Sequence, residues 1–86
     1  MKISIDISYY PLNEEYKNPI KKFIKALEEN EKILVKPNKM STHVFGEYDD
    51  VMAAVTKCIK NAFEFPDSIF VLKIMNIDRD KQNIIH

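Results

Sequence analysis

The side chains best suited to chemistry lie together in the segment from Met40 to Asp50, Met-Ser-Thr-His-Val-Phe-Gly-Glu-Tyr-Asp-Asp. Hydroxyls, an imidazole, an aromatic ring and a carboxylate in one short stretch are uncommon where packing alone sets the sequence. The segment alternates as a β-strand does, with successive side chains on opposite faces. One face is expected to carry Met40, Thr42, Val44 and Gly46, and the other Ser41, His43, Phe45 and Glu47.

A second row of polar side chains is predicted on the first strand, from Lys2 to Tyr10, which alternates strictly. One face is apolar and holds Ile3, Ile5, Ile7 and Tyr9; the other holds Ser4, Asp6, Ser8 and Tyr10. Pro11 is expected to end the pairing, because proline has no backbone N–H. Two strands therefore each offer a face with hydrogen-bonding groups.

Two helices must hold these strands in place. Asn18-Pro19 has the residue types of an N-cap followed by the first helical position, and Asn30 is a plausible C-cap. The apolar stripe between them is Ile20, Phe23, Ile24 and Leu27. A second helix is expected after Asp49 or Asp50, either of which can cap it. Its expected buried stripe is Met52, Val55, Ile59 and Ala62 or Phe63.

Two more strands complete the pattern. Residues 33–35 predict a short edge strand, which Pro37-Asn38 turns into the strand beginning near Met40. Residues 68–75 predict the last strand, apolar on both faces apart from Lys73. The chain is read as one domain over residues 1–86, and residues 77–86 are expected to be a frayed tail.

The order βαββαβ predicts an α+β, ferredoxin-like fold, with a four-stranded antiparallel sheet in the order 4-1-3-2 and both helices on one face. Turning Phe45 toward the helices would also bury His43 and Glu47, so we expect Val44 to point inward instead. The other sheet face would then be uncovered and partly apolar. Such a face is usually covered by a second copy, which predicts a homodimer or homotetramer built through the sheet faces.

Composition narrows the classes of function. Thirteen basic and thirteen acidic side chains give a formal net charge of zero, so no overall field attracts nucleic acid or an anionic membrane. Cys58 is the only cysteine, and no apolar run approaches the ~20 residues that span a bilayer. No apolar signal run opens the chain, and we expect a cytoplasmic protein.

Three segments resemble the YkoF-like family that binds thiamine and hydroxymethylpyrimidine: Asp6-Ile-Ser-Tyr-Tyr-Pro-Leu12, Met40-Ser-Thr-His-Val-Phe-Gly-Glu-Tyr-Asp-Asp-Val51 and Phe70-Val-Leu-Lys-Ile-Met-Asn76. The resemblance implies a ferredoxin-like fold, oligomers formed through open sheet faces, and binding of thiamine or its pyrimidine half without catalysis. It also implies that the strand with Ser41, Thr42 and Glu47 belongs to the site. The first strand is implied less directly, and His43 lies outside the motif.

The chemistry of the residues agrees with such a ligand. An aminopyrimidine needs a carboxylate or carbonyl to accept from its amine and a donor for its ring nitrogens, and a thiazolium cation favours an aromatic face or a carboxylate. The candidate ligand-binding residues are Ser41, Thr42, Glu47, Asp6, Ser8, Tyr10 and Phe45. Thr42 has a structural alternative, a hydroxyl bonded to backbone, and Asp6 and Ser8 could simply line an interface. We expect no metal and no cofactor other than this ligand.

Other functions remain open at this point. An RNA-recognition module has the same βαββαβ order, and Tyr10 and Phe45 could stack bases, but Glu47 would repel phosphate. A purely structural oligomer is a further alternative. A phosphatase of this fold would need an arginine in a phosphate-binding loop, and the only arginine is Arg79 near the end. We therefore expect a binding protein and not an enzyme.

Overall fold

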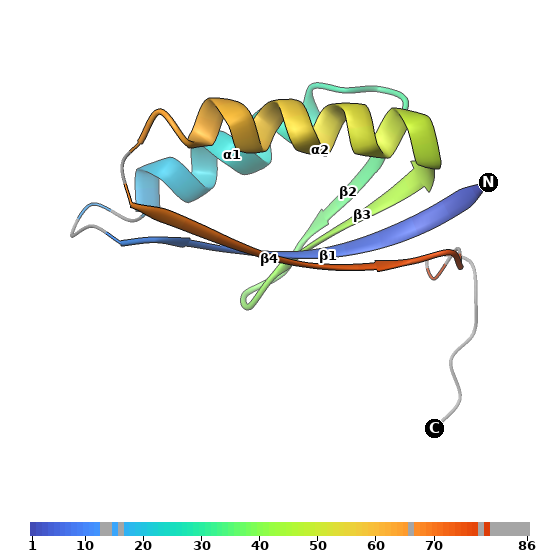
Figure 1. Cartoon of the computed structure of the whole chain (residues 1–86), viewed down its shortest axis with the longest axis horizontal. Coiled ribbons are helices and arrows are strands. Elements are labelled where there is room, and N and C mark those ends of the chain that lie inside the picture. The colour runs from blue at the N-terminus through green and yellow to red at the C-terminus, as the bar shows by residue number, and fades with distance from the viewer. Residues whose placement is uncertain (13–14, 16, 66, 78, 80–86) are drawn as a thin grey trace.

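The computed structural model describes residues 1–12, 15, 17–65, 67–77 and 79. Its elements are β1 (Lys2–Pro11), α1 (Lys17–Glu28), β2 (Leu34–Pro37), β3 (Thr42–Glu47), α2 (Tyr48–Ala62) and β4 (Ser68–Met75). The strands pair antiparallel in one sheet with the order β2-β3-β1-β4, and both helices lie on the same side of it (Figure 1). The α+β, ferredoxin-like prediction and its strand order 4-1-3-2 are confirmed.

The core lies between the helices and the inner face of the sheet. The isoleucines of β1 are 1–2% exposed, and Val44 of β3, paired opposite Ile5, is 0% exposed. Removing each such side chain from water contributes about 1.5–3 kcal/mol before the entropy of folding is counted. The helices add Phe23, Leu27, Val51, Ala54, Val55 and Cys58. Val44 points inward, as expected, so the polar row of β3 faces the uncovered side.

The ends of several elements differ from the predictions. Strand β3 begins at Thr42, so Met40 is not on its inner face but in the preceding turn, 90% exposed. Helix α2 begins directly after β3, with Glu47 at the N-cap position and no side-chain cap bond. Asp49 and Asp50 instead lie in its first turn, where negative charge favours the helix dipole.

The buried stripe of α2 shares Val55 with the prediction but is otherwise shifted by one residue toward the start of the helix. It consists of Val51, Ala54, Val55 and Cys58. Met52, Ile59 and Ala62 lie at the margin of the core, and Phe63 is 56% exposed. No loop separates β3 from α2, so the strand end sets the rotation of the helix, and sequence periodicity alone cannot supply that constraint.

Gly46 allows the close contact between the end of β3 and α2. Its φ is +155°, a backbone conformation that side-chain-bearing residues rarely adopt. A Cβ atom there would lie 3.1 Å from Cγ2 of Val51, which is itself 0% exposed. The glycine therefore allows the strand to pass directly into the helix.

Replacing Gly46 with alanine should destabilise the fold by about 1 kcal/mol or more, because the side chain adds backbone strain and crowds Val51. Chemical denaturation followed by circular dichroism measures this. The contact is tested by a double-mutant cycle with Val51→Ala, in which the cost of Gly46→Ala should fall by about 0.5 kcal/mol or more. An unchanged cost in that background would show that Val51 is not the obstacle.

Candidate functional site

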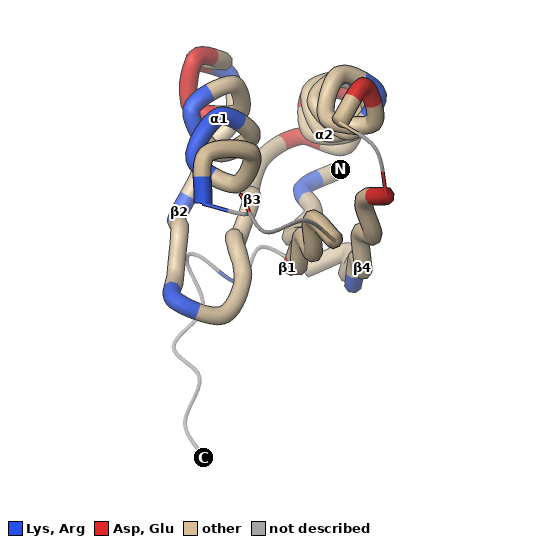
Figure 2. Tube along the Cα trace, turned by 90° about the vertical axis from the view of Figure 1, so that its left-hand side faces the viewer, with Lys and Arg blue, Asp and Glu red and all other residues tan. Residues whose placement is uncertain are grey.

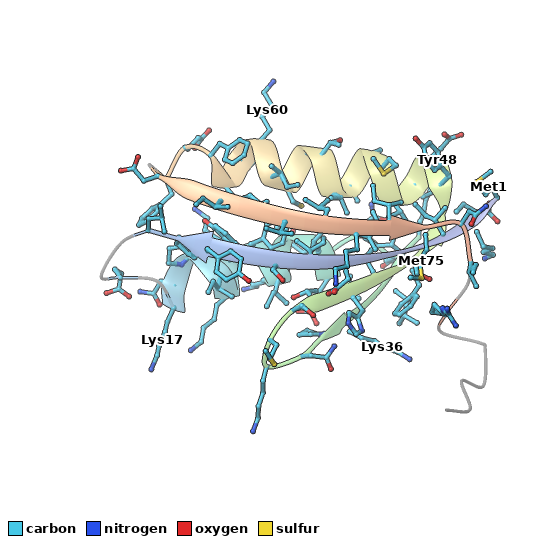
Figure 3. The ribbon with its side chains drawn as sticks, turned by 60° about the horizontal axis from the view of Figure 1, so that its bottom comes forward. Met1, Lys17, Lys36, Tyr48, Lys60 and Met75 are labelled. Carbon is cyan, nitrogen blue, oxygen red and sulfur yellow. The ribbon has the colours of Figure 1, made fainter. Side chains whose placement is uncertain are left out.

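The sheet face turned away from the helices gathers side chains from all four strands. Directly paired residues in an antiparallel sheet share a face. Asp6 is therefore flanked by His43 of β3 and Lys73 of β4, and Ser4 by Phe45 and Met75. Figure 3 turns this side forward, with Lys36 and Met75 projecting from the two edge strands. We call this surface the open face.

A cavity of about 460 Å³ lies on the open face. This volume is within the range of small-molecule sites. Its lining residues are Ser4, Ile5, Asp6, His43, Phe45, Lys73, Met75 and Arg79. The open-face cavity thus combines a carboxylate, an imidazole and an aromatic ring from two adjacent central strands.

The chain beyond β4 contributes to one wall of the open-face cavity. The Ser4 hydroxyl donates to the carbonyl of Ile77 at 2.5 Å and accepts from the backbone N–H of Arg79 at 2.9 Å. Ser4 is only 5% exposed as a result. Most of the tail that was expected to fray, residues 77–86, lies outside the described residues, but these two residues lie against β1.

The polar centre of the cavity is a cluster around His43. Its Nε2 lies 3.5 Å from Oδ1 of Asp6 and 3.5 Å from Oγ of Ser41. Its Nδ1 lies 3.2 Å from Nδ2 of Asn38 in the turn between β2 and β3. Ser41 and Asp6, which the sequence named, are thus joined by a residue that the sequence placed outside the motif.

Phe45 forms an apolar wall rather than an exposed stacking platform. It is 9% exposed. The ammonium of Lys36 lies 5.7 Å from its ring centroid, and the His43 ring meets it edge-on at 6.3 Å. A ligand in the cavity would contact the part of the ring that remains accessible.

Glu47 lies away from this cluster, at the end of β3. The Met1 ammonium donates a hydrogen bond to its carboxylate at 2.9 Å, and Lys2 Nζ lies 3.8 Å from the other oxygen. The ammonium of Met1, followed by Lys2, holds the pKa of the Glu47 carboxyl below its usual value. The side chain is about half exposed and does not line the open-face cavity.

The remaining predicted site residues lie elsewhere. Thr42 is 6% exposed and shares the helix-side face with Val44, so it is separated from the open face by the sheet. Ser8 and Tyr10 lie on the open face but toward the other end of β1, paired with Val71 and Ile69. Asp6 and Phe45 are the two predicted residues that line the cavity.

Sequence reasoning missed several lining residues. Lys73 was named only as the exception in an otherwise apolar strand, although a lone lysine in such a strand was a usable signal. Ser4 was placed on the polar face of the first strand but was not named as a site residue, and Met75 and Arg79 reach the cavity through the strand register and the return of the chain after β4. His43 could have been found from its alternation with Ser41 and Phe45.

A second cavity, of about 410 Å³, lies on the opposite side of the sheet, between α1 and α2. Its walls include Tyr9, Phe23 and Phe65, and Cys58 contributes to its lining. Burial raises the pKa of the Cys58 thiol, which keeps it in the neutral, weakly nucleophilic form. The described residues that line this helix-side cavity do not include a histidine.

Within the described ranges, no group of three or more histidine, cysteine, aspartate or glutamate side chains is placed to hold a metal ion. Over the same residues, neither helix has the length and apolar character needed to cross a membrane.

Comparisons with known structures agree with the fold. A Streptococcus pneumoniae protein has a TM-score of 0.84 at 21% identity, over 94% of this chain and 92% of that one. A Methanocaldococcus protein has a TM-score of 0.76 at 24% identity, over 98% and 88% of the two chains. A Thermotoga maritima protein, named as a candidate thiamine biosynthesis/salvage protein, has a TM-score of 0.75 at 19% identity, over 86% and 82%.

The family assignment comes from the sequence as a whole. No curated protein matches the chain. The sequence model described as "Thiamine-binding protein" matches residues 5–86, which include every residue of the cluster around His43. The resemblance read from the three segments is thereby confirmed, and the chain belongs to the thiamine-binding protein family.

Proposed function

We propose that this chain is a non-catalytic binding protein for thiamine or its hydroxymethylpyrimidine half, and that the ligand lies in the open-face cavity. The observation that carries this is the cavity itself, with Asp6, His43 and Phe45 on neighbouring strands of a chain in the thiamine-binding family. The role would be carriage, salvage or sensing of the ligand, and thiamine would be cargo rather than a cofactor.

The cavity suits an aminopyrimidine. Its exocyclic amine is a donor and needs an acceptor such as the Asp6 carboxylate, while its ring nitrogens need a donor such as an imidazole N–H. Phe45 and Met75 supply apolar contact for the ring. In thiamine, the positive thiazolium would gain from the carboxylate, whereas the pyrimidine half alone would use only the hydrogen bonds.

The geometry around His43 does not support nucleophilic catalysis. In a Ser-His-Asp triad the serine and the carboxylate contact different ring nitrogens, so that the acid orients the base. Here Ser41 and Asp6 both lie near Nε2, and Nδ1 faces Asn38. Ser41 therefore fits a hydrogen-bonding role better than that of a nucleophile.

We also propose that two copies meet through their open faces, as a homodimer or homotetramer. Apolar side chains on this face are strongly exposed in the single chain, including Tyr10 (51%), Val71 (49%), Ile69 (47%), Leu34 (42%) and Met75 (39%). An apolar surface of this kind marks an interaction site. A second sheet would cover it and close the cavity against solvent.

The RNA-recognition alternative is less well supported. Base stacking needs exposed rings on the central strands, but Phe45 is 9% exposed. Four lysines on α1 lie on the helix side, away from the open face (Figure 2). Of the described rings that β1 and β3 place on the open face, Tyr10 is the exposed one, so a bound single strand would lack a stacking platform across the two central strands.

Calorimetric titration of the wild-type protein with thiamine and with hydroxymethylpyrimidine should show saturable binding of at least one of them. Asp6→Asn should weaken that binding by at least about tenfold, because it removes a charged acceptor from the amine. Asp49→Asn, an exposed first-turn position on α2, is the matched control and should bind as wild type does. Absence of binding by the wild type at millimolar ligand contradicts the proposal.

Light scattering after size-exclusion chromatography should give a mass of at least two chains for the wild type. Val71→Lys should shift the protein to the monomer with an unchanged circular dichroism spectrum, because an ammonium would be desolvated in a sheet-to-sheet contact. Lys60→Glu on α2 alters charge outside the open face and should leave the mass unaltered. A monomeric wild type would rule out the proposed assembly.

A further inference from the structure

One carboxylate oxygen of Asp6 is buried and makes no hydrogen bond among the described residues, although His43 lies nearby. This oxygen, Oδ1, has essentially no contact with solvent. Burying a carboxylate oxygen without a hydrogen-bond donor costs free energy. A ligand that supplies a donor to this oxygen would therefore bind more tightly. The unused acceptor lies beside the open-face cavity, which Asp6 lines.

Asn38 sets the tautomer of the His43 imidazole, which lies beside Asp6. The amide nitrogen of Asn38 donates to the carbonyl of Lys36 at 3.2 Å, which fixes the direction of the amide group. The same nitrogen lies 3.2 Å from Nδ1 of His43, so Nδ1 must accept. The proton of the neutral ring is then on Nε2, the nitrogen that lies near Asp6 and Ser41.

The turn between β2 and β3 holds this arrangement in place. The backbone N–H of Asn38 donates to the carbonyl of Ser41 at 2.8 Å, which closes the turn. Asn38 thus contacts His43 from the β2–β3 turn, and Asp6 lies opposite His43 on the neighbouring strand β1. The result is a donor, Nε2–H, and an acceptor, Oδ1, only 3.5 Å apart at the edge of one cavity.

We propose that Asp6 and His43 together read the amidine-like edge of the ligand, and that Asn38 is the positioning residue that fixes the tautomer of His43. Oδ1 accepts from the exocyclic amine, and Nε2–H donates to the adjacent ring nitrogen. This inference rests on the proposed function and deepens it. It defines the ligand class as heteroaromatic amines with a donor and an acceptor side by side.

The charges around His43 set the conditions for this readout. Asp6 on β1 and Lys36 on β2 are the two residues paired with His43. Lys73 on β4 is paired with the other side of Asp6, and Arg79 lines the same cavity. The bond from Asn38 and the proposed edge readout both use the neutral form of the His43 ring. A protonated ring would instead lose the Asn38 bond and pair with the carboxylate.

The edge readout predicts discrimination between amino and oxo pyrimidines. In the 4-oxo analogue of hydroxymethylpyrimidine, a carbonyl replaces the amine and the adjacent ring nitrogen carries a proton, so both hydrogen bonds are reversed. Calorimetry at pH 8 should show the wild type binding the 4-amino compound at least about tenfold more tightly. His43→Phe keeps an aromatic ring but no N–H, and should reduce that ratio severalfold.

Asn38→Asp tests the positioning role with a nearly isosteric change. A carboxylate beside Nδ1 would hold the proton on that nitrogen, leaving Nε2 as an acceptor. The amino-to-oxo ratio should therefore fall toward one. Lys73→Gln, at a lining residue outside the edge readout, should change both affinities together and leave the ratio unaltered.

The outcomes separate the two proposals. Tight, selective binding by the wild type with a reduced ratio in His43→Phe and Asn38→Asp supports the inference. Equal binding of the amino and oxo compounds by the wild type, or an unchanged ratio in Asn38→Asp, overturns the inference and leaves the proposed function standing. Failure of the wild type to bind either pyrimidine overturns the inference, and failure to bind thiamine as well overturns both.

Discussion

The structure depends on the strict alternation of β1, a central strand that pairs with β3 on one side and β4 on the other. Its isoleucines enter the core between sheet and helices, which commits every second residue, including Asp6, to the opposite face. A slip of one residue would exchange the two rows and bury a carboxylate among aliphatic side chains. Hydrophobic burial on one side of the sheet therefore places the polar groups on the other, where a ligand can reach them.

The same constraint makes the open face an incomplete surface. Two helices cover one side of a four-stranded sheet, and the described part of the chain after β4 covers only the region around Ser4. A cavity with a buried carboxylate oxygen that makes no hydrogen bond among the described residues lies at one end of the face, and exposed apolar residues such as Tyr10 and Val71 lie at the other. On this one surface, a ligand would supply the missing hydrogen bond to Asp6, and a second copy of the chain would bury the exposed apolar side chains.

Most of the fold could be read from the sequence, because alternation in β1, the apolar stripe of α1 and the inward choice for Val44 all follow from local patterns. Those patterns could not set the rotation of α2, which is fixed by the direct junction at Gly46. Local sequence patterns also could not show which polar residues of β3 lie at the cavity. Glu47 was named as a site candidate and His43 was placed outside the motif. The Glu47 carboxylate is held by the Met1 amino group, whereas register and the β2–β3 turn make His43 the centre of the cluster.

Backbone amide chemical-shift mapping during titration with hydroxymethylpyrimidine tests the central claim most directly, because the sheet separates the two cavities. We expect the largest shifts at Asp6, His43 and Lys73 on the open face. Shifts concentrated instead around Phe23 and Cys58, in the helix-side cavity, would contradict the account.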